Sequence, residues 1–254
     1  MPKHNLMVAM PVARGVTPST VACIFNIRSE VEKHSSLIHL SQLHRMPLDL
    51  ARNELATVFL STTCDMALLI DDDIQIAPEW APKMMAALDA GCDIVSAPCR
   101  MRSEGNLFNI VPLGEPTDIG GLRVVECAWT GLGAVMVARR VFEKLMSEMS
   151  IEHYRSTVMP ERTSAAMFKS RVEPAKKFFI EAPEDLNVYL LDDRAWSLRC
   201  HEAGFKIHAA IDVPTVHDGM TGCFSEEAEK LSRLQAREAA RGASKLVGVD
   251  GKAI

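Results

Sequence analysis

No Cys-x-x-Cys pair occurs in this sequence, and its seven cysteines are an odd number for a disulfide framework. The chain therefore lacks the patterns of a small disulfide-stapled protein and of a zinc ribbon. The seven are Cys23, Cys64, Cys92, Cys99, Cys127, Cys200 and Cys223. Such a set is typical of reduced, mostly buried thiols, and it favours a cytosolic compartment.

Long hydrophobic runs and an excess of positive charge are also missing. No stretch of 18 or more apolar residues occurs, and the N-terminus shows no signal-peptide pattern, so we expect a soluble, cytoplasmic protein without a transmembrane segment. Peripheral contact with a membrane stays open. The formal net charge of −5 excludes a global basic field that would attract nucleic acid or anionic lipid.

Internal repeats, low-complexity tracts and clear linkers are absent as well. The length of 254 residues suits one large domain, and a hydrophobic content of 48% is near the average for a globular protein with a sizeable core. We therefore expect a single domain over residues 1–224, followed by a helix and tail over residues 225–254. The sequence leaves the oligomeric state open.

Apolar runs and helix signals alternate in the first half of the chain. A buried strand is predicted at Leu6–Met10, ended by Pro11, and the mixed pattern over Thr17–Leu40 favours a helix. Asp49 is a suitable N-cap for a helix that reaches about Leu60. The next elements are a strand at Met66–Ile70, a helix from Pro78 to Ala90 that Gly91 stops, and a strand at Asp93–Pro98. This alternation predicts an α/β fold with a central, mostly parallel sheet flanked by helices.

The second half is less regular. Glycine and proline recur over residues 100–122, which predicts loops or short hairpins. The later elements are strands at Val124–Ala128, Ala134–Ala138 and Phe205–Ile211, helices at Arg140–Met149 and Asp192–Ala203, and a charged helix after Ser225 that ends at Gly242. Residues 153–177 lack periodicity and are basic, because six Lys or Arg minus two Glu gives +4. They form either a mobile substrate loop or a solvated surface connection.

Three consecutive aspartates, Asp71, Asp72 and Asp73, directly follow the predicted strand Met66–Ile70. Carboxylates at the end of a buried strand are costly unless a positive group meets them, and a hard divalent cation prefers oxygen ligands. In an extended chain Asp71 and Asp73 point to one side and Asp72 to the other. The alternative is a turn or a helix N-terminus, where consecutive aspartates also occur.

Two further polar pairs are candidates for a site. Arg52 suits phosphate through its bidentate fork and Asn53 suits a base or ribose edge, although an arginine on a helix surface is the ordinary case. Asp192 and Asp193 precede a helical pattern. They act either as helix caps, the favoured interpretation from sequence alone, or as a general base held ionised by the helix dipole.

Three features of the second half complete the set of candidates. His217 lies in a loop after the last strand, where a neutral imidazole is a suitable ligand beside an oxygen-rich metal site. Gly131 and Gly133 permit close approach of the backbone to a ligand, but they do not form a dinucleotide fingerprint. Trp129 is suited to stacking on a sugar face, although a packed core tryptophan is more common.

Taken together, these motifs resemble the GT-A glycosyltransferases, which use nucleotide-activated sugars. The resemblance covers roughly residues 5 to 220 in colinear order. It comprises Val8-Ala9-Met10-Pro11, Ala51-Arg52-Asn53, Leu68-Leu69-Ile70-Asp71-Asp72-Asp73-Ile74, Asp93-Ile94-Val95-Ser96-Ala97-Pro98, Gly131-x-Gly133 with Arg139-Arg140-Val141-Phe142, Leu191-Asp192-Asp193 with Gly204-Phe205-Lys206-Ile207, and His217. The segment from Leu68 to Ile74 looks like the family's Asp-x-Asp signature, the most specific of these motifs.

The resemblance implies a Rossmann-like GT-A sandwich with a C-terminal helical appendix and a divalent-metal-dependent transfer of a sugar to an acceptor hydroxyl. It implies Mn²⁺ or Mg²⁺ on Asp71, Asp73 and His217, with Asp71 also near the ribose. A UDP- or GDP-sugar is the expected donor, held by Pro11, Arg52, Asn53, Asp71, Asp72, Gly131 and Gly133. Asp193 or Asp192 is the implied base, with Trp129 and Asp192 on the acceptor side.

Two departures from the family and two other classes of protein stay open. The acidic motif is Asp-Asp rather than Glu-Asp, and residues 150–180 match no family motif. The acceptor is a saccharide, a lipid-linked sugar, a protein or a modified DNA base. The alternatives are a catalytically silent nucleotide-sugar-binding module and another metal-dependent nucleotide-phosphate enzyme, such as a nucleotidyltransferase.

Overall fold

The computed structural model describes residues 4–13, 15–34, 37–44, 46–100, 108–148, 150–177, 183, 185–217 and 220–222. The predicted helix after Ser225 and the boundary between residues 1–224 and 225–254 fall outside these ranges. Within them, no helix is both long enough and apolar enough to cross a membrane.

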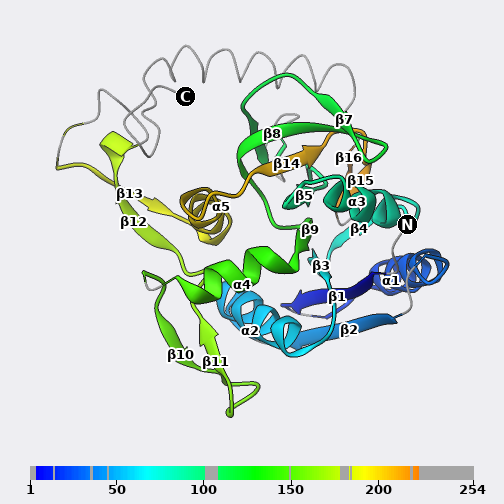
Figure 1. The fold of residues 1–254 in the computed structure, drawn as a ribbon, viewed down its shortest axis with the longest axis horizontal. Helices are drawn as coiled ribbons and strands as arrows, with labels where there is room; N and C mark the ends of the chain where they lie inside the picture. The colour runs from blue at the N-terminus through cyan, green and yellow to red at the C-terminus, as the bar shows by residue number, and fades with distance from the viewer. Residues whose placement is uncertain are drawn as a thin grey trace.

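The fold is mixed α/β, with one large sheet between two layers of helices (Figure 1). The helices are α1 (Pro18–Val31), α2 (Leu48–Ser61), α3 (Trp80–Asp89), α4 (Arg139–Ser147) and α5 (Asp192–Glu202), with a 3₁₀ turn at Ala175–Lys177. The strands of the large sheet are β1 (Asn5–Val12), β2 (Leu37–His44), β3 (Met66–Ile70), β5 (Ile94–Ser96), β6 (Ile110–Pro112), β7 (Thr117–Ile119), β8 (Leu122–Thr130), β9 (Ala134–Ala138) and β14 (Ile207–Ala210).

The strand order of the large sheet is β2-β1-β3-β9-β5-β14-β8-β6, and β7 also pairs with β8. The pairs β1–β2, β1–β3 and β5–β14 are parallel, whereas β9 and β8 run antiparallel to their neighbours. Most strands therefore share one direction, and the prediction of a mostly parallel sheet is confirmed.

Two hydrophobic cores lie on opposite faces of this sheet. One packs α1 and α3 against alternate strand residues such as Leu6 and Val8, and the other packs α2, α4 and α5 against Met7 and Ala9. This alternation along β1 is what a strand buried on both faces requires. The carboxyl end of β3 is thereby fixed between two helical layers.

Three small sheets surround the large one. One is the hairpin β10 (His153–Arg155) with β11 (Thr163–Ala165), and a second is the hairpin β12 (Arg171–Pro174) with β13 (Asn187–Leu190). The third joins β4 (Ile74–Ile76), β15 (Thr215–His217) and β16 (Met220–Gly222). The basic segment 153–177 therefore contains short strands, and its role as a substrate loop or a surface connection stays open.

The predicted helix Thr17–Leu40 is too long. Helix α1 ends at Val31, and Leu37–His44 forms the edge strand β2, which pairs with β1 along its whole length. Backbone pairing to a distant strand decides the conformation here, and a local apolar pattern does not reveal it.

Two other boundaries differ in an informative way. Pro11 does not end the first strand, because β1 continues to Val12. The pairing of β1 with β3 stops at Ala9, so no hydrogen bond to β3 requires the N–H that Pro11 lacks. Asp49 is not the N-cap of α2, since Pro47 holds that position and Asp49 lies in the first turn, where a carboxylate suits the helix dipole.

Candidate functional site

The aspartate triplet lies where β3 ends and the chain turns into β4. Asp71 donates its backbone N–H to the carbonyl of Gly133 at 2.9 Å, and its own carbonyl accepts from Ile74 at 3.2 Å. The carboxylate of Asp72 accepts from the backbone N–H of Ala13 at 2.8 Å. Asp72 therefore fastens the turn to the loop after β1 and, unlike Asp71, does not line the pocket described below.

Arg52 joins the two acidic motifs of the chain. Its side chain is 3% exposed, and one nitrogen donates to both carboxylate oxygens of Asp71, at 2.8 and 3.0 Å, while the other donates to Asp192. Burial opposes the charge of Arg52, but the two carboxylates outweigh burial and raise the pKa of the guanidinium. Burial raises the pKa of Asp71 as well, although Arg52 opposes that shift. The arginine thus holds carboxylates that lie 121 residues apart (192 − 71) in the sequence.

Asp192 and Asp193 form the first turn of α5, and neither caps it. Leu191 holds the N-cap position, and no side chain makes a capping bond, so the capping interpretation is wrong. Asp193 accepts the backbone N–H of Arg194 at 2.7 Å. Burial, with the nearby charge of Asp192, raises the pKa of Asp193. Arg52 pairs with Asp192, so among the described residues Asp193 is the one of the two carboxylates with no cationic side chain bonded to it.

His217 and Asp73 face each other across the small sheet of β4 and β15. The Nδ1 of His217 lies 3.0 Å from the carbonyl oxygen of Arg100, and Nε2 lies 3.6 Å from a carboxylate oxygen of Asp73. A carbonyl only accepts, so Nδ1 donates to it, and this bond turns Nε2 towards Asp73. This arrangement is the usual one for a histidine that ligates a metal.

Two of the three predicted metal ligands are therefore together, while Asp71 is paired with Arg52. Within the described ranges, no group of three or more His, Cys, Asp or Glu side chains is arranged to hold a metal ion. Mg²⁺ commonly takes one or two protein ligands and fills its shell with waters and substrate phosphates, and its neighbouring ligands are about 3 Å apart. The donor set of Asp73 and His217 fits a cation of that kind.

One pocket of about 380 Å³ has five of these side chains in its lining, those of Arg52, Asp71, Asp192, Asp193 and His217, whereas Asp72 and Asp73 are not among its lining residues. The pocket is lined by Leu48, Arg52, Asp71, Ile74, Cys99, Arg100, Asn109, Gly131, Leu132, Gly133, Asp192, Asp193 and His217. Its size falls within the usual range for a small-molecule site. Burial, with a contribution from Asp71, raises the pKa of Cys99 to about 12, so this thiol stays protonated and is not a thiolate ligand.

Three predicted site residues lie elsewhere. Asn53 is 3% exposed and its side-chain oxygen accepts the backbone N–H of Phe168 at 2.9 Å, which ties α2 to the segment after β11. Pro11 is a buried residue of β1. Trp129 lies on β8 with the guanidinium of Arg194 at 4.5 Å from its ring centroid. The structure does not bring these residues to the pocket.

Sequence reasoning missed Asn109, which shapes the glycine-containing wall. Its side-chain oxygen accepts the N–H of Cys99 at 2.7 Å, and its carbonyl accepts the N–H of Gly131 at 2.7 Å. A Cβ on Gly131 would lie 2.0 Å from the amide nitrogen of Asn109. Gly131 is therefore required by a neighbouring side chain, and the irregular segment 100–122 carries no local signal of that contact.

Replacing Gly131 by Ala is expected to destabilise the protein by about 1–3 kcal/mol, as overpacking typically does, because the short side chain of Asn109 has to leave its bond to Cys99. Urea unfolding measures the change. Gly114→Ala is the control, since a Cβ there meets nothing within 4 Å. Equal stability of the two variants would contradict the role assigned to Asn109.

Comparisons with known proteins bear on the fold alone. No protein-family model matches the chain, and no curated protein matches it. Among solved structures, the chain is similar to A197 from STIV, with a TM-score of 0.51 and 14% identity over 84% of this chain and 85% of that one. At this identity the likeness shows a shared fold and nothing about activity.

Two weaker similarities involve transferases. One is apo UDP-glucose pyrophosphorylase, with a TM-score of 0.39 and 13% identity over 91% of this chain and 82% of that one. The other is a glycosyltransferase involved in the glycosylation of the major capsid of PBCV-1, with a TM-score of 0.29 and 9% identity over 57% and 68%. At TM-scores below 0.5 neither carries an argument, so the comparisons establish an α/β fold similar to that of A197.

Proposed function

We propose that this protein is a divalent-metal-dependent glycosyltransferase that moves a sugar from a nucleotide-sugar donor to an acceptor hydroxyl. One observation carries the proposal. A single pocket at the carboxyl end of β3 brings together Arg52, Asp71, Asp193 and His217 from four separate segments of the chain. In open α/β sheets, this edge is where ligands bind.

The donor side is assigned to His217, which lines the pocket, and to Asp73, whose carboxylate lies 3.6 Å from it. The carboxylate of Asp73 and the Nε2 atom of His217 would hold Mn²⁺ or Mg²⁺, and the diphosphate of a UDP- or GDP-sugar would complete the set of ligands. Bound there, the cation supplies charge neutralisation for the departing nucleoside diphosphate. Gly131 and Gly133 let the side chains of Asn109, Ile74 and Cys99 pack closely against this wall, because a Cβ at either glycine would meet them.

Arg52 is assigned a positioning role rather than a contact with the nucleotide. Its guanidinium is almost fully buried and is already bonded to Asp71 and Asp192. By holding both carboxylates, it fixes the distance between the donor side and the acceptor side of the pocket. Such fixed geometry lowers the entropic part of the barrier in a two-substrate reaction.

Asp193 is the residue assigned to the acceptor hydroxyl. In an inverting reaction it takes the hydroxyl proton as the acceptor oxygen bonds to the anomeric carbon. The bond from that carbon to the diphosphate breaks, and its electron pair leaves with the nucleoside diphosphate. A carboxyl group whose pKa is raised by burial is better matched to proton abstraction near neutral pH than an ordinary one.

A thermal-shift titration with UDP- and GDP-sugars, with and without Mn²⁺, tests the donor assignment. A true donor at about 100 times its dissociation constant should stabilise the protein by about 2.7 kcal/mol. We expect that gain to require Mn²⁺ and to be lost in Asp73→Asn. The control Asp118→Asn replaces an exposed aspartate on β7 and should keep it.

Retention of the full donor-dependent shift by Asp73→Asn would contradict the assignment. Tight, Mn²⁺-dependent binding without turnover on saccharide, lipid-linked, protein or modified-DNA acceptors would instead identify a silent binding module.

A further inference from the structure

Two arginines line the pocket, and only one of them is already paired. Arg52 is 3% exposed and is bonded to Asp71 and Asp192. Arg100 is partly buried, and its guanidinium forms no hydrogen bond or ion pair with any residue that the structure describes. The positive charge of Arg100 is therefore the one that is open to a ligand in the pocket.

Hydrogen bonds on two sides fix the backbone of Arg100. Along β15, the hydroxyl of Thr215 donates to the carbonyl of Pro98 at 3.0 Å, and Nδ1 of His217 donates to the carbonyl of Arg100 at 3.0 Å. On its other side, Arg100 forms an antiparallel bridge with Phe108. The base of the Arg100 side chain is thus held beside His217, the candidate metal ligand.

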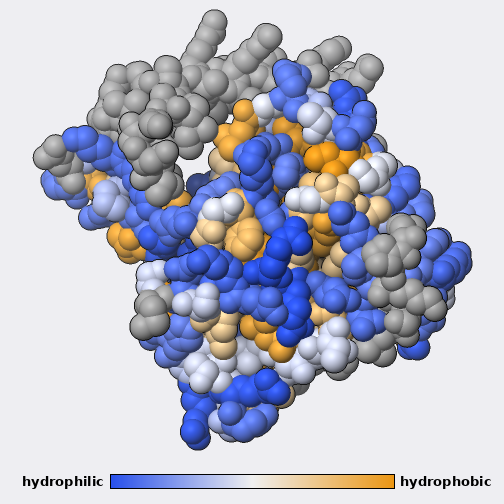
Figure 2. All heavy atoms as spheres, viewed as in Figure 1, coloured by the Kyte–Doolittle hydropathy of each residue, from blue (hydrophilic) through white to orange (hydrophobic). Residues whose placement is uncertain are grey.

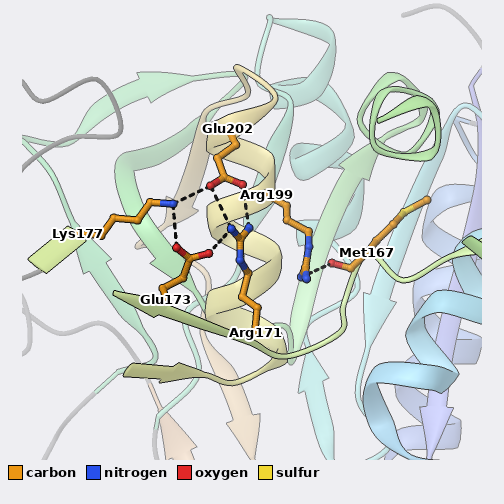
Figure 3. Close-up of polar contacts among 6 residues, drawn as sticks. All are labelled: Met167, Arg171, Glu173, Lys177, Arg199 and Glu202. Carbon is orange, nitrogen blue, oxygen red and sulfur yellow. Dashed lines mark hydrogen bonds and ion pairs between the residues drawn. The ribbon is translucent and has the colours of Figure 1, made fainter. Parts of the chain in front are cut away.

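Two other partly buried arginines have the partners that Arg100 lacks (Figure 3). Arg171 pairs with Glu173 and, at 2.9 Å, with Glu202 of α5. Arg199 donates to a backbone carbonyl at 3.0 Å. A charged group that leaves bulk water is costly unless a partner meets it. Arg100 departs from this pattern at the pocket, which is where a bound anion would supply the partner.

Negative side chains outnumber positive ones around the pocket. Its lining holds three aspartates and two arginines, a formal charge of −1, and Asp73 beside His217 adds another carboxylate. A diphosphate is repelled by such a set of charges unless positive groups meet it. A divalent cation offsets part of that repulsion, and a guanidinium is suited to the rest because its planar fork matches phosphate oxygens.

We propose that Arg100 binds a phosphate of the donor diphosphate, so that the diphosphate lies between this guanidinium and a cation on Asp73 and His217. The inference rests on the proposed function and names the side chain that selects a diphosphate at this site. Phosphate binding is the role that sequence favours for Arg52, whose guanidinium is bonded to Asp71 and Asp192 instead.

Titration calorimetry with inorganic pyrophosphate and Mg²⁺ tests the assignment without a nucleotide, a sugar or turnover. Arg100→Gln is expected to bind pyrophosphate about 10- to 100-fold more weakly than wild type, the usual contribution of hydrogen bonds to a charged group. Arg100→Lys keeps the charge and loses the fork, so it should recover part of that affinity. Both variants should unfold at the wild-type temperature, because the guanidinium has no partner among the described residues.

A matched control separates this site from general attraction to the surface. Hydrophilic residues cover much of the face in Figure 2, and the chain has 28 Lys and Arg in total, so an anion is attracted weakly at many places. Arg28→Gln removes the same charge from an exposed side chain of α1 that pairs with Glu32. It should bind pyrophosphate as tightly as wild type does.

Equal affinity of wild type and Arg100→Gln for pyrophosphate overturns the inference. An equal loss in Arg28→Gln does so too, and so does a wild-type protein that binds no pyrophosphate. Failure of the proposed function gives a different result. A protein that transfers no sugar but loses pyrophosphate affinity in Arg100→Gln keeps its phosphate site and is not a transferase. A protein that transfers sugar, with an unchanged KM for the donor in Arg100→Gln, contradicts the role of Arg100 alone.

Discussion

Asp193→Asn is expected to lower the rate of sugar transfer by about 10²–10⁴-fold while donor binding stays intact, because a positioned general base contributes that much to proton transfer. Asparagine has the same shape, and its side-chain oxygen still accepts the N–H of Arg194 that Asp193 accepts at 2.7 Å. It cannot take the proton of an acceptor hydroxyl. Initial rates of transfer, together with the Mn²⁺-dependent thermal shift, separate the two effects.

The same substitution should change the pH dependence of stability in a defined direction. The pKa of Asp193 is raised in the folded protein, chiefly by burial, so the folded state holds this proton more tightly than the unfolded chain does. Stability contributed by the carboxyl is full below the unfolded pKa of about 3.9 and is lost as pH rises through the folded pKa. The free energy of unfolding of Asp193→Asn minus that of wild type should therefore be larger at pH 7 than at pH 4.

Urea unfolding at the two pH values measures that difference, and Asp118→Asn, which replaces an exposed aspartate on β7, serves as the control. If Asp193→Asn transfers sugar at the wild-type rate, then Asp193 is not the general base. A stability difference of opposite sign would show that burial does not raise the pKa of the Asp193 carboxyl.

The elements that sequence predicts best are those whose residues are buried all round. The strands Met66–Ile70 and Ala134–Ala138 match their predicted bounds, and both are buried at every position. A continuous apolar run of that length, bounded by polar residues, is typical of a strand that is buried on both faces. Strand β2 was missed because it is an edge strand, and pairing with β1 determines its conformation.

The sequence predicts which types of residue form the site better than it predicts which side chains contact each other there. Asp71, Asp193 and His217 line one pocket, and their roles in it stay a prediction. The partners of Arg52 do not follow from sequence, because Asp192 lies 140 residues away and only the packing of α2 against the sheet brings them together. Asn53 and Asp72 are drawn instead into backbone contacts with Phe168 and Ala13.

Strand β12 shows the same limit, because Glu173 is buried while its neighbour Val172 is 61% exposed. An ordinary surface strand turns its apolar side inward. Ion pairs with Glu202 on α5 select the opposite orientation. A pattern of period two identifies the two faces of a strand, and the partner on the neighbouring helix decides which face is buried.

Arg52→Met is expected to destabilise the protein by about 3–5 kcal/mol, the usual cost of removing one partner from a buried ion pair. Methionine keeps much of the volume, so the loss comes from Asp71 and Asp192, which then face each other without a cation. Both carboxylates are tethered to rigid elements, Asp71 by its bond to Gly133 and Asp192 by the first turn of α5, and neither can move away to relieve the repulsion.

Equilibrium unfolding in urea measures the effect, and Arg28→Met is the control. Arg28 forms an exposed i,i+4 pair with Glu32, whose loss should cost less than about 0.5 kcal/mol. If Arg52 serves only to balance charge, then Arg52→Met combined with Asp71→Asn and Asp192→Asn should regain much of the lost stability, because replacing all charged partners together is often neutral. That triple variant should still fail to transfer sugar, because no residue then holds Asp71 and Asp192 at a fixed distance from each other. Stability of Arg52→Met within 1 kcal/mol of wild type would show that the two acidic motifs do not depend on this arginine.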